Sequence, residues 1–267
     1  MIVTGKGGSG SWKIRGEQLG AALGATVVAK AEDVRGEDVL VIKKDNGCNI
    51  KGAKTIIWDV VDCWPQPDAS AWSQQKLIDH IKDIAARMKV DKVIAATKQM
   101  ALDLDTPYYL YHHGRTYAHL NPIREHVRTV GYEGSYKFLG RWGQVVEEEC
   151  RLRGWKFVVN PVVITDCDIL VALRDVPYRG YASDNWKSNI KLANAQNSGT
   201  PIICNSEKGY TETYSGAELW ADMPDELRRA FNILDHQGER LWRAAKLREK
   251  TYTVEMAAAD FKRIHAC

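Results

Sequence analysis

Short apolar segments that alternate with amphipathic helical segments are the feature that most constrains the fold of this chain. In the first half, apolar runs bounded by glycine, proline or polar residues predict strands at 2–4, 25–29, 38–43, 54–61, 91–96 and 108–111. Between them, apolar positions recur with helical spacing at 12–23, 73–88 and 98–104. Strands that alternate with helices predict an α/β protein with a parallel, doubly wound sheet.

The second half repeats this pattern. Strands are expected at 129–132, 155–160, 168–174 and 201–204, and helices at 140–153, within 185–198, from 224 onward and at 238–265. We therefore expect two Rossmann-like domains, at 1–120 and 121–250, and a C-terminal helix at 251–267 that packs back on the first domain. Two such domains leave a cleft at the carboxyl ends of their strands, where ligands bind in this architecture.

Composition narrows the class of protein. The 267 residues are 45% hydrophobic, which is enough for one large core or two medium ones. No apolar run approaches the roughly 20 residues that cross a bilayer. The six cysteines form no C-x-x-C pair, which is typical of free thiols rather than of a disulfide framework or a zinc site. A net charge of +3 neither demands nor excludes a nucleic-acid partner.

The stretch from 185 to 201 predicts an anion site. It reads as a loop that enters a helix, with Lys187 and Lys191 on one helical face and Ser188 and Asn189 at the first turn. Free backbone N–H groups, the helix dipole and two ammonium groups together suit a diphosphate. The alternative is a solvated surface helix with ordinary lysines.

The glycine loop after the first strand has three interpretations. Its sequence, G-K-G-G-S-G at 5–10, matches the dinucleotide pattern G-x-G-x-x-G, and Glu32 stands where a ribose-binding acid is expected. It can also be a plain turn, or a loop at the cleft rim whose amides at Gly8, Ser9 and Gly10 face a phosphate. A Walker A motif is excluded, because Ser11-Trp12 stands where Lys-Ser/Thr is required.

Polar residues follow the strands of the first half. Asp62 comes at the tip of the segment W-D-V-V-D-C-W, so it is a better candidate than Asp59 to face the cleft as a general base. His112 and His113 end another strand, and one of them could hold a donor sugar. Each has a plain structural alternative: a turn-capping aspartate, or a surface histidine in a linker.

The second half carries its own polar residues at successive strand ends. Arg174 ends the strand at 168–174, and Glu207, Tyr210 and Glu212 follow the next strand. Arg174 would bind the same anion as Lys187 and Lys191. A carboxylate here could accept hydrogen bonds from a ribose diol or from sugar hydroxyls.

At this point the chain resembles a GT-B-fold glycosyltransferase, a class built from two Rossmann-like domains. The resemblance is carried by K-S-N-I-K-L-A-N-A-Q-N-S-G-T-P-I-I at 187–203, which is similar to the donor-side helix and strand of nucleotide-sugar transferases, and by D-K-V-I-A-A-T-K-Q-M-A at 91–101. Many retaining members carry a Glu-x7-Glu motif before this strand, and Asn194 stands where their second, ribose-binding Glu would be.

The resemblance implies a nucleotide sugar, UDP-glucose being expected, on the C-terminal domain and an acceptor on the N-terminal one. Arg174, Lys187 and Lys191 would stabilise the leaving diphosphate without a metal, and Asp62 would be the base if the reaction inverts. The implied donor-binding residues are Gly8, Ser9, Gly10, His113, Arg174, Lys187, Ser188, Asn189, Lys191, Asn194, Glu207, Tyr210 and Glu212.

The short chain further resembles the bacteriophage enzymes that glycosylate 5-hydroxymethylated pyrimidines in DNA. This implies a cytoplasmic protein of the infected host that binds double-stranded DNA, with a target base flipped into the cleft. Basic residues expected to contact phosphates are Lys6, Lys13, Arg15, Lys43, Lys44, Lys51, Lys54, Arg115, Arg124 and Arg128, and the acceptor-binding residues expected are Trp12, Lys13, Arg15, Asp62 and Trp64.

Other functions stay open from the sequence. A glycosyltransferase that acts on a cell-surface glycan or a small molecule is the first alternative. An NAD-binding oxidoreductase built on the glycine loop, and a nucleotide- or DNA-binding module without catalytic activity, come from other classes.

Overall fold

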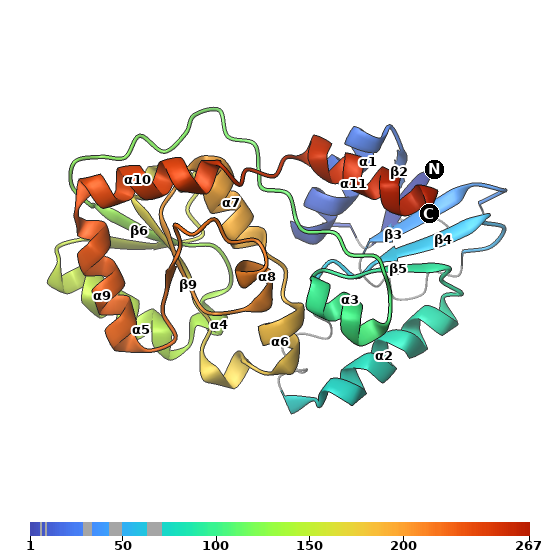
Figure 1. The fold of residues 1–267 in the computed structure, drawn as a ribbon, viewed down its shortest axis with the longest axis horizontal. Helices are drawn as coiled ribbons and strands as arrows, with labels where there is room; N and C mark the ends of the chain where they lie inside the picture. Colours follow the sequence, from blue (N-terminus) through green and yellow to red (C-terminus); the bar gives the residue numbers. More distant parts are fainter. Residues whose placement is uncertain (6, 9, 29–33, 43–49, 63–70) are drawn as a thin grey trace. The chain divides into compact units, whose positions relative to one another are not determined.

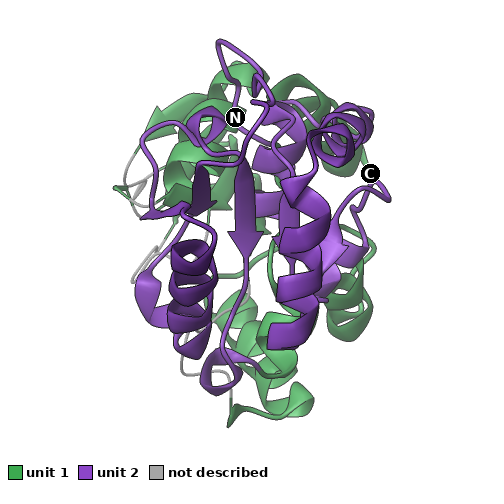
Figure 2. Ribbon diagram, turned by 90° about the vertical axis from the view of Figure 1, so that its left-hand side faces the viewer, with its two compact units in different colours: residues 1–113, 180–188, 254–267 green, residues 114–179, 189–253 purple. Residues whose placement is uncertain are grey.

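The protein was analysed as a computed structural model that describes residues 1–267 except 6, 9, 29–33, 43–49 and 63–70. It contains two compact units, coloured separately in Figure 2. Unit 1 consists of residues 1–113, 180–188 and 254–267, and unit 2 of residues 114–179 and 189–253. The domain ranges expected from the sequence, 1–120, 121–250 and 251–267, stay a prediction.

Unit 1 is built on a parallel five-stranded sheet (Figure 1). Its strands are β1 (Ile2–Gly5), β2 (Thr26–Val28), β3 (Asp38–Ile42), β4 (Thr55–Asp59) and β5 (Lys92–Ile94), in the order β2-β1-β3-β4-β5. The last residue of β1 must be glycine, because a Cβ at Gly5 would lie 2.5 Å from the carbonyl oxygen of Ile42 on the neighbouring strand. That glycine therefore serves strand packing.

Helices cover both faces of this sheet. One face carries α2 (Gln74–Arg87), α3 (Lys98–Leu104) and α6 (Tyr181–Trp186), whose apolar side chains form one core with the strand residues Val39, Val41, Ile56 and Trp58. The N-terminal region supplies a π-helix, η1 (Trp12–Gln18), and α1 (Leu19–Leu23), which contacts the C-terminal α11 (Val254–Ala266). Ser73 and Thr97 are the N-cap residues of α2 and α3, and their hydroxyls accept a hydrogen bond from the N–H three residues on.

Unit 2 repeats the same strand order with different sequence. Its sheet runs β10-β9-β8-β6-β7 and is parallel throughout. The strands are β6 (Thr129–Tyr132), β7 (Lys156–Val159), β8 (Ile169–Ala172), β9 (Ile202–Cys204) and β10 (Leu219–Trp220). Counted along the chain, both sheets have the order 2-1-3-4-5, a common doubly wound topology.

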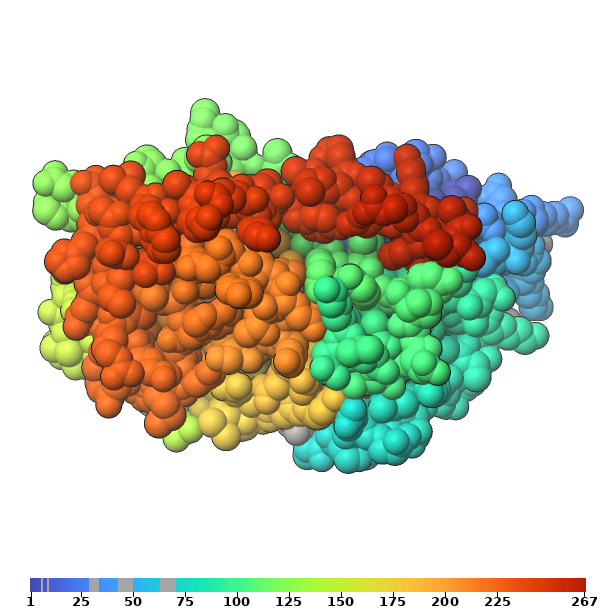
Figure 3. All heavy atoms as spheres, viewed as in Figure 1, coloured from blue at the N-terminus to red at the C-terminus, as the bar shows by residue number. Residues whose placement is uncertain are grey.

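The helices of unit 2 also lie on both faces of its sheet. Helices α5 (Arg141–Leu152) and α9 (Pro224–Asp235) pack on one face with Val130, Ile169 and Val171. Helices α7 (Ile190–Ser198), α8 (Lys208–Thr211) and α10 (Gln237–Arg248) pack on the other with Leu170, Ile202 and Cys204. Figure 3 shows α9 and α10 on the outer surface of the unit. Short helical turns complete it: α4 (Tyr136–Leu139), η3 (Ile164–Asp166) and η4 (Val176–Tyr178).

Three expected elements differ from the structure. The strand expected at 108–111 is a single bridge between Ala95 and Tyr109. The helix expected at 12–23 is π-helical over its first part, where the ring of Trp12 packs on Gly16. The long helix expected at 238–265 is two helices, α10 and α11. The chain is extended between them because the backbone of Tyr252 bonds instead to Asn197 and to the N–H of Gly114.

Candidate active site

The shared topology marks one edge of each sheet for ligands. In a doubly wound sheet, ligands bind beyond the carboxyl ends of the strands, where neighbouring strands connect in opposite directions. In unit 2 this position lies between β6 and β8. The residues that follow β6, β8 and β9 are therefore the candidates for contact with a ligand.

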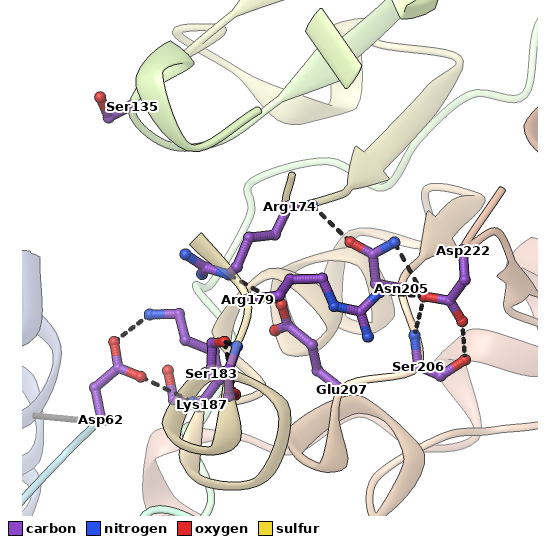
Figure 4. A network of polar contacts seen from close by, with 12 residues as sticks. Asp62, Ser135, Arg174, Arg179, Ser183, Lys187, Asn205, Ser206, Glu207 and Asp222 are labelled. Carbon is purple, nitrogen blue, oxygen red and sulfur yellow. Dashed lines mark hydrogen bonds and ion pairs between the residues drawn. The ribbon is translucent and has the colours of Figure 1, made fainter. Parts of the chain in front are cut away.

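Arg174 and Glu207 meet at this edge of unit 2. Arg174 comes two residues after β8 and Glu207 three residues after β9. The arginine Nε donates to Glu207 Oε1 across 3.1 Å, and both side chains are almost fully buried. The backbone N–H of Arg174 donates to Asn205 Oδ1 across 2.6 Å, so the strand ends are fastened together (Figure 4). The structure thus brings together two residues that the sequence placed at successive strand ends.

A polar network continues from Asn205. Its amide Nδ2 donates to the carbonyl of Ala221 across 2.7 Å and to Asp222 Oδ1 across 3.3 Å. Asp222 also accepts from the Ser206 hydroxyl and from Arg179 Nη1 (Figure 4). Burial raises the pKa of Asp222, but these two donors outweigh it and hold the pKa below its usual value. The network keeps the loop after β9 in a fixed conformation.

Lys191 and Tyr210 lie at the same edge. Lys191 projects from α7, and its Nζ lies 4.4 Å from the ring centroid of Tyr132, the last residue of β6. Burial raises the pKa of Tyr132 to about 12, and both Arg174 and Glu207 influence it, so all four groups are close. Burial, with Glu207 beside it, raises the pKa of Tyr210 well above its usual range. Both phenols therefore stay neutral near pH 7.

Asn194 takes part in a second polar group of unit 2. Its Nδ2 donates to Glu133 Oε2 across 3.0 Å, and its Oδ1 accepts from the backbone N–H of Arg115 across 3.0 Å. Arg115 Nη1 lies 3.3 Å from Glu133 Oε1. Glu133 directly follows β6, so this group also belongs to the carboxyl edge of the sheet.

The interpretation of Lys187 and Lys191 as neighbours on one helical face is wrong. Helix α6 ends at Trp186, Lys187 has extended backbone angles, and α7 begins only at Ile190. The residues also belong to different units, since Ser188 is the last residue of its segment of unit 1 and Asn189 the first of unit 2. Asn189 is the N-cap residue of α7 and is buried.

Lys187 and Ser188 instead bind Asp62 within unit 1. Lys187 Nζ forms an ion pair with Asp62 Oδ2, and the Ser188 N–H donates to Asp62 Oδ1 across 3.0 Å (Figure 4). Burial raises the pKa of Asp62, but the lysine ammonium and the serine N–H outweigh it, and the pKa lies below its usual value. Asp62 is therefore a carboxylate that already holds two partners.

Buried charges lie beside Asp62. Arg15 is fully buried, with Nε 3.4 Å from Asp59 Oδ2 and Nη2 2.5 Å from the carbonyl of Leu110. His112 Nε2 lies 3.1 Å from the carbonyl of Val61, and His113 Nε2 lies 3.1 Å from Gln18 Oε1. Burial and the nearby Arg15 lower the pKa of His113 to about 4 and that of His112 well below its usual value. Both rings are neutral at pH 7.

Two of the residues expected to bind the acceptor, Trp12 and Arg15, are buried. Arg15 is buried in the core of unit 1, where it pairs with Asp59, so its side chain is not exposed to an acceptor. Trp12 is 6% exposed and packs on Gly16, while Lys13 is exposed. Trp64 lies outside the described residues.

The other residues expected in the site are in the glycine loop, at the end of α8, or outside the described part of the chain. Gly8 has a φ of +77°, and a Cβ at Gly8 or Gly10 would meet no atom within 4 Å. Glu212 is the C-cap residue of α8 and is half-buried. Residues Lys6, Ser9, Glu32, Lys43 and Lys44 lie outside the described part of the chain.

No group of three or more His, Cys, Asp or Glu side chains among the described residues could hold a metal ion. None of the helices that these residues form has the length and apolar character needed to cross a membrane.

Four residues of the site were missed from the sequence. Tyr132 was assigned only to the strand, and Glu133 only to the turn after it. A carboxylate that directly follows a strand at the edge of a doubly wound sheet was the available signal, since such positions face ligands. Asn205 and Asp222 were missed as well, because their partners Arg174, Ala221 and Arg179 lie in segments distant in sequence from at least one of them.

Comparison with solved structures identifies the fold. The Anabaena protein Alr3699/HepE in complex with UDP-glucose aligns with 100% of this chain and 99% of its own, with a TM-score of 0.64 and 9% identity. WaaG, a glycosyltransferase involved in lipopolysaccharide biosynthesis, gives 0.59 and 12%, over 100% of this chain and 99% of its own. A glycosyltransferase from Rickettsia africae ESF-5 gives 0.57 and 10%, over 99% and 97%. No protein-family profile and no curated protein matches the chain.

The fold is therefore GT-B, with two Rossmann-like parallel α/β units, as the sequence predicted. At 9–12% identity these likenesses establish the architecture. The narrower resemblance to bacteriophage DNA glucosyltransferases stays a prediction.

Proposed function

We propose that this protein is a glycosyltransferase that uses a UDP-sugar, with the nucleotide bound at the carboxyl edge of the unit 2 sheet. The observation that carries the proposal is the placement of Arg174 and Lys191 around Tyr132, at the position between β6 and β8 where this topology binds ligands. Two neighbours of the same fold are described as glycosyltransferases, and another contains UDP-glucose.

The chemistry of sugar transfer suits these two cations. When the bond between the anomeric carbon and the diphosphate breaks, negative charge grows on the leaving phosphate oxygen. Fixed positive groups in a partly buried site stabilise that charge more than water does. Arg174 is held in place by Glu207 and Asn205, so its guanidinium is ordered before the nucleotide arrives. Glucose is the sugar that we propose.

Asp62 has two possible roles in this reaction. As a general base it would take the proton of the acceptor hydroxyl. Its ion pair with Lys187 lowers its pKa, which makes it a weaker base, and favours a role in anchoring the segment Lys187–Ser188. Replacement of Asp62 by Asn distinguishes the two roles. Loss of turnover at unchanged UDP affinity and unchanged stability supports the base, whereas loss of stability at unchanged turnover supports the anchor.

The acceptor is the second part of the proposal. DNA that contains 5-hydroxymethylated pyrimidines was predicted from the sequence. Several basic residues expected to contact DNA are instead occupied by carboxylates: Arg15 by Asp59, Arg115 by Glu133 and Arg124 by Asp168. This observation favours the alternative, a glycan or small-molecule hydroxyl, and the description of WaaG agrees with it.

A binding panel followed by a transfer assay tests the proposal. We expect UDP and UDP-glucose to raise the melting temperature, and NAD to leave it unchanged. Stabilisation by NAD and not by UDP would instead support an oxidoreductase. Radiolabelled UDP-glucose is then offered with hydroxymethylated DNA, with unmodified DNA as its control, and with a lipopolysaccharide core glycan. Label on hydroxymethylated DNA alone supports the DNA acceptor, and label on the glycan alone supports the alternative. Binding without donor hydrolysis or transfer contradicts an enzymatic function.

A further inference from the structure

Helix α7 presents two different groups to the end of strand β6. Lys191 and Asn194 are three residues apart, so they lie on the same helical face, about 4.5 Å apart along the axis. Lys191 lies over Tyr132 and Asn194 binds Glu133, which are consecutive residues. A cation and a carboxylate thus stand side by side at one edge of the sheet. A nucleoside diphosphate needs the same pair, because its ribose diol lies next to its phosphates.

Asn194 itself is poorly suited to bind a diol. Its side-chain oxygen accepts from the N–H of Arg115, and its nitrogen donates to Glu133. Asn194 is also 2% exposed. A vicinal diol is best held by one acceptor with two oxygen atoms, and an amide offers only one. These contacts give Asn194 the role of fixing Glu133.

Glu133 has the required acceptor capacity. A carboxylate offers about four acceptor positions. Within the described part of the chain, Asn194 occupies one position on Oε2 and Arg115 one on Oε1. The next residue is also held, because the Gly134 N–H donates to Asn160 Oδ1 across 2.8 Å. The carboxylate is therefore oriented from several sides while each oxygen keeps capacity for a hydroxyl.

A buried hydroxyl nearby points to a polar ligand. The Tyr117 hydroxyl is buried and has no hydrogen-bond partner among the described residues. Burial raises the pKa of Tyr117 and Glu133 raises it further, so the two groups are close. Buried polar atoms normally have partners, and a partner outside the protein can be a water, an ion or a bound molecule. A ribose beside Glu133 would supply that partner.

We propose that Glu133 binds the 2′,3′-diol of the nucleotide ribose, with Asn194 as its positioning residue. The inference rests on the proposed UDP-sugar donor and assigns the ribose contact to a strand-end residue instead of to position 194. The competing explanation is that Glu133 only links Arg115 and Asn194 to the sheet.

Deoxynucleotides separate these explanations. We would measure the affinities of UDP, 2′-deoxy-UDP and 3′-deoxy-UDP by calorimetry for the full chain and its variants. The unchanged protein should prefer UDP over either deoxynucleotide by about 10- to 100-fold, the range for one hydrogen bond to a charged group. Glu133→Gln should bring both ratios toward one. Glu148→Gln, an exposed glutamate on α5, is the matched control and should keep them.

The exchanged pair gives a stricter test. Glu133→Asn combined with Asn194→Glu returns a carboxylate to the same contact and should restore part of the preference for UDP. If Glu133→Gln does not fold, Glu133→Asp retracts the carboxylate by one methylene and should lower the ratios. Unchanged ratios in a folded Glu133→Gln or Glu133→Asp variant overturn the assignment. Failure of the unchanged protein to bind UDP at all contradicts the proposed donor instead, so the two failures are distinct.

Discussion

The two units share a strand order and both hold ion pairs at the carboxyl edge of their sheet, but they differ in the groups that lie beside these pairs. At the carboxyl edge of unit 1, every charged group described near Asp62 is closed into an internal pair: Arg15 with Asp59, and Asp62 with Lys187. Its two histidines are buried and neutral. At the same edge of unit 2, Arg174 and Lys191 share a site with aromatic rings and carboxylates.

The strand order is the same in both units, so it determines only which edge of the sheet can bind a ligand. The side chains at that edge determine whether it serves stability or binding. Buried ion pairs contribute little net stability but become very costly when one partner is lost. In unit 1 they fix the ends of strands against helices. In unit 2 the proposed nucleotide would offer Arg174 phosphate oxygens in addition to the carboxylate of Glu207.

Arg174→Ala tests the unit 2 side of this comparison and should have the largest effect. Loss of one charged donor to a developing oxyanion lowers kcat by about 10²- to 10³-fold. Steady-state kinetics of UDP-sugar turnover measure it, with Arg174→Lys expected to recover part of the loss. The control is Arg151→Ala, on an exposed face of α5, which should leave kcat unchanged. Normal turnover by a folded Arg174→Ala protein would contradict the proposed donor site.

Arg15→Met tests the unit 1 side and should act on stability. It leaves Asp59 buried without its cation, and breaking such a pair costs about 3–5 kcal/mol. The urea midpoint measures the loss. Arg15→Met with Asp59→Asn removes both charges and should recover much of it. If the double variant is as unstable as the single one, the charge pairing is not the cause.

Lys187→Met should change how stability depends on pH. The folded pKa of Asp62 is lowered, so its ionised form stabilises the fold above the unfolded pKa, and this contribution is lost as the pH falls through the folded value. The variant should therefore be less stable than the unchanged protein at pH 7, and the difference should shrink on acidification below about pH 4. Unfolding at a series of pH values shows this. A difference that does not vary with pH would rule out the ion pair as its source.

His113→Gln should have the smallest effect. The pKa of His113 is about 4 when folded, so the unfolded chain binds the proton first as the pH falls below about 6.5. Folding stability should decline between these pH values in the unchanged protein and decline less in the variant. His119→Gln, at an exposed position, is the comparison and should keep the original slope. Equal slopes in all three proteins would mean that His113 is accessible to protons when folded.

The fold was predictable because its signals are local. The turns around each apolar run located β3, β4, β6 and β9 to within two residues at each end. The two-residue β10 was missed, since two residues show no periodicity. Helix α6, which ends at Trp186, and the break before α7 were missed; Lys187 in this break pairs with Asp62, which is 125 residues away in sequence.

The candidate site was predictable only in part, for a related reason. Residue type and strand-end position were enough to single out Arg174 and Glu207, which form an ion pair. They did not single out Glu133, because its contacts with Asn194 and Arg115 join residues that are 61 and 18 positions away in sequence. Arg15 was expected to be exposed because it is a basic residue close to a glycine loop. It is instead buried beside Asp59, which lies at the end of β4 and is distant in sequence.

The segment 180–188 makes the two units inseparable by simple truncation. It belongs to unit 1 although unit 2 surrounds it in sequence, and it supplies Tyr181, Ala182 and Trp186 to the unit 1 core. A fragment that ends near residue 120 would lose these side chains and α11 together. Transfer of unit 1 to another protein of the same fold would therefore have to move three separate segments of chain together.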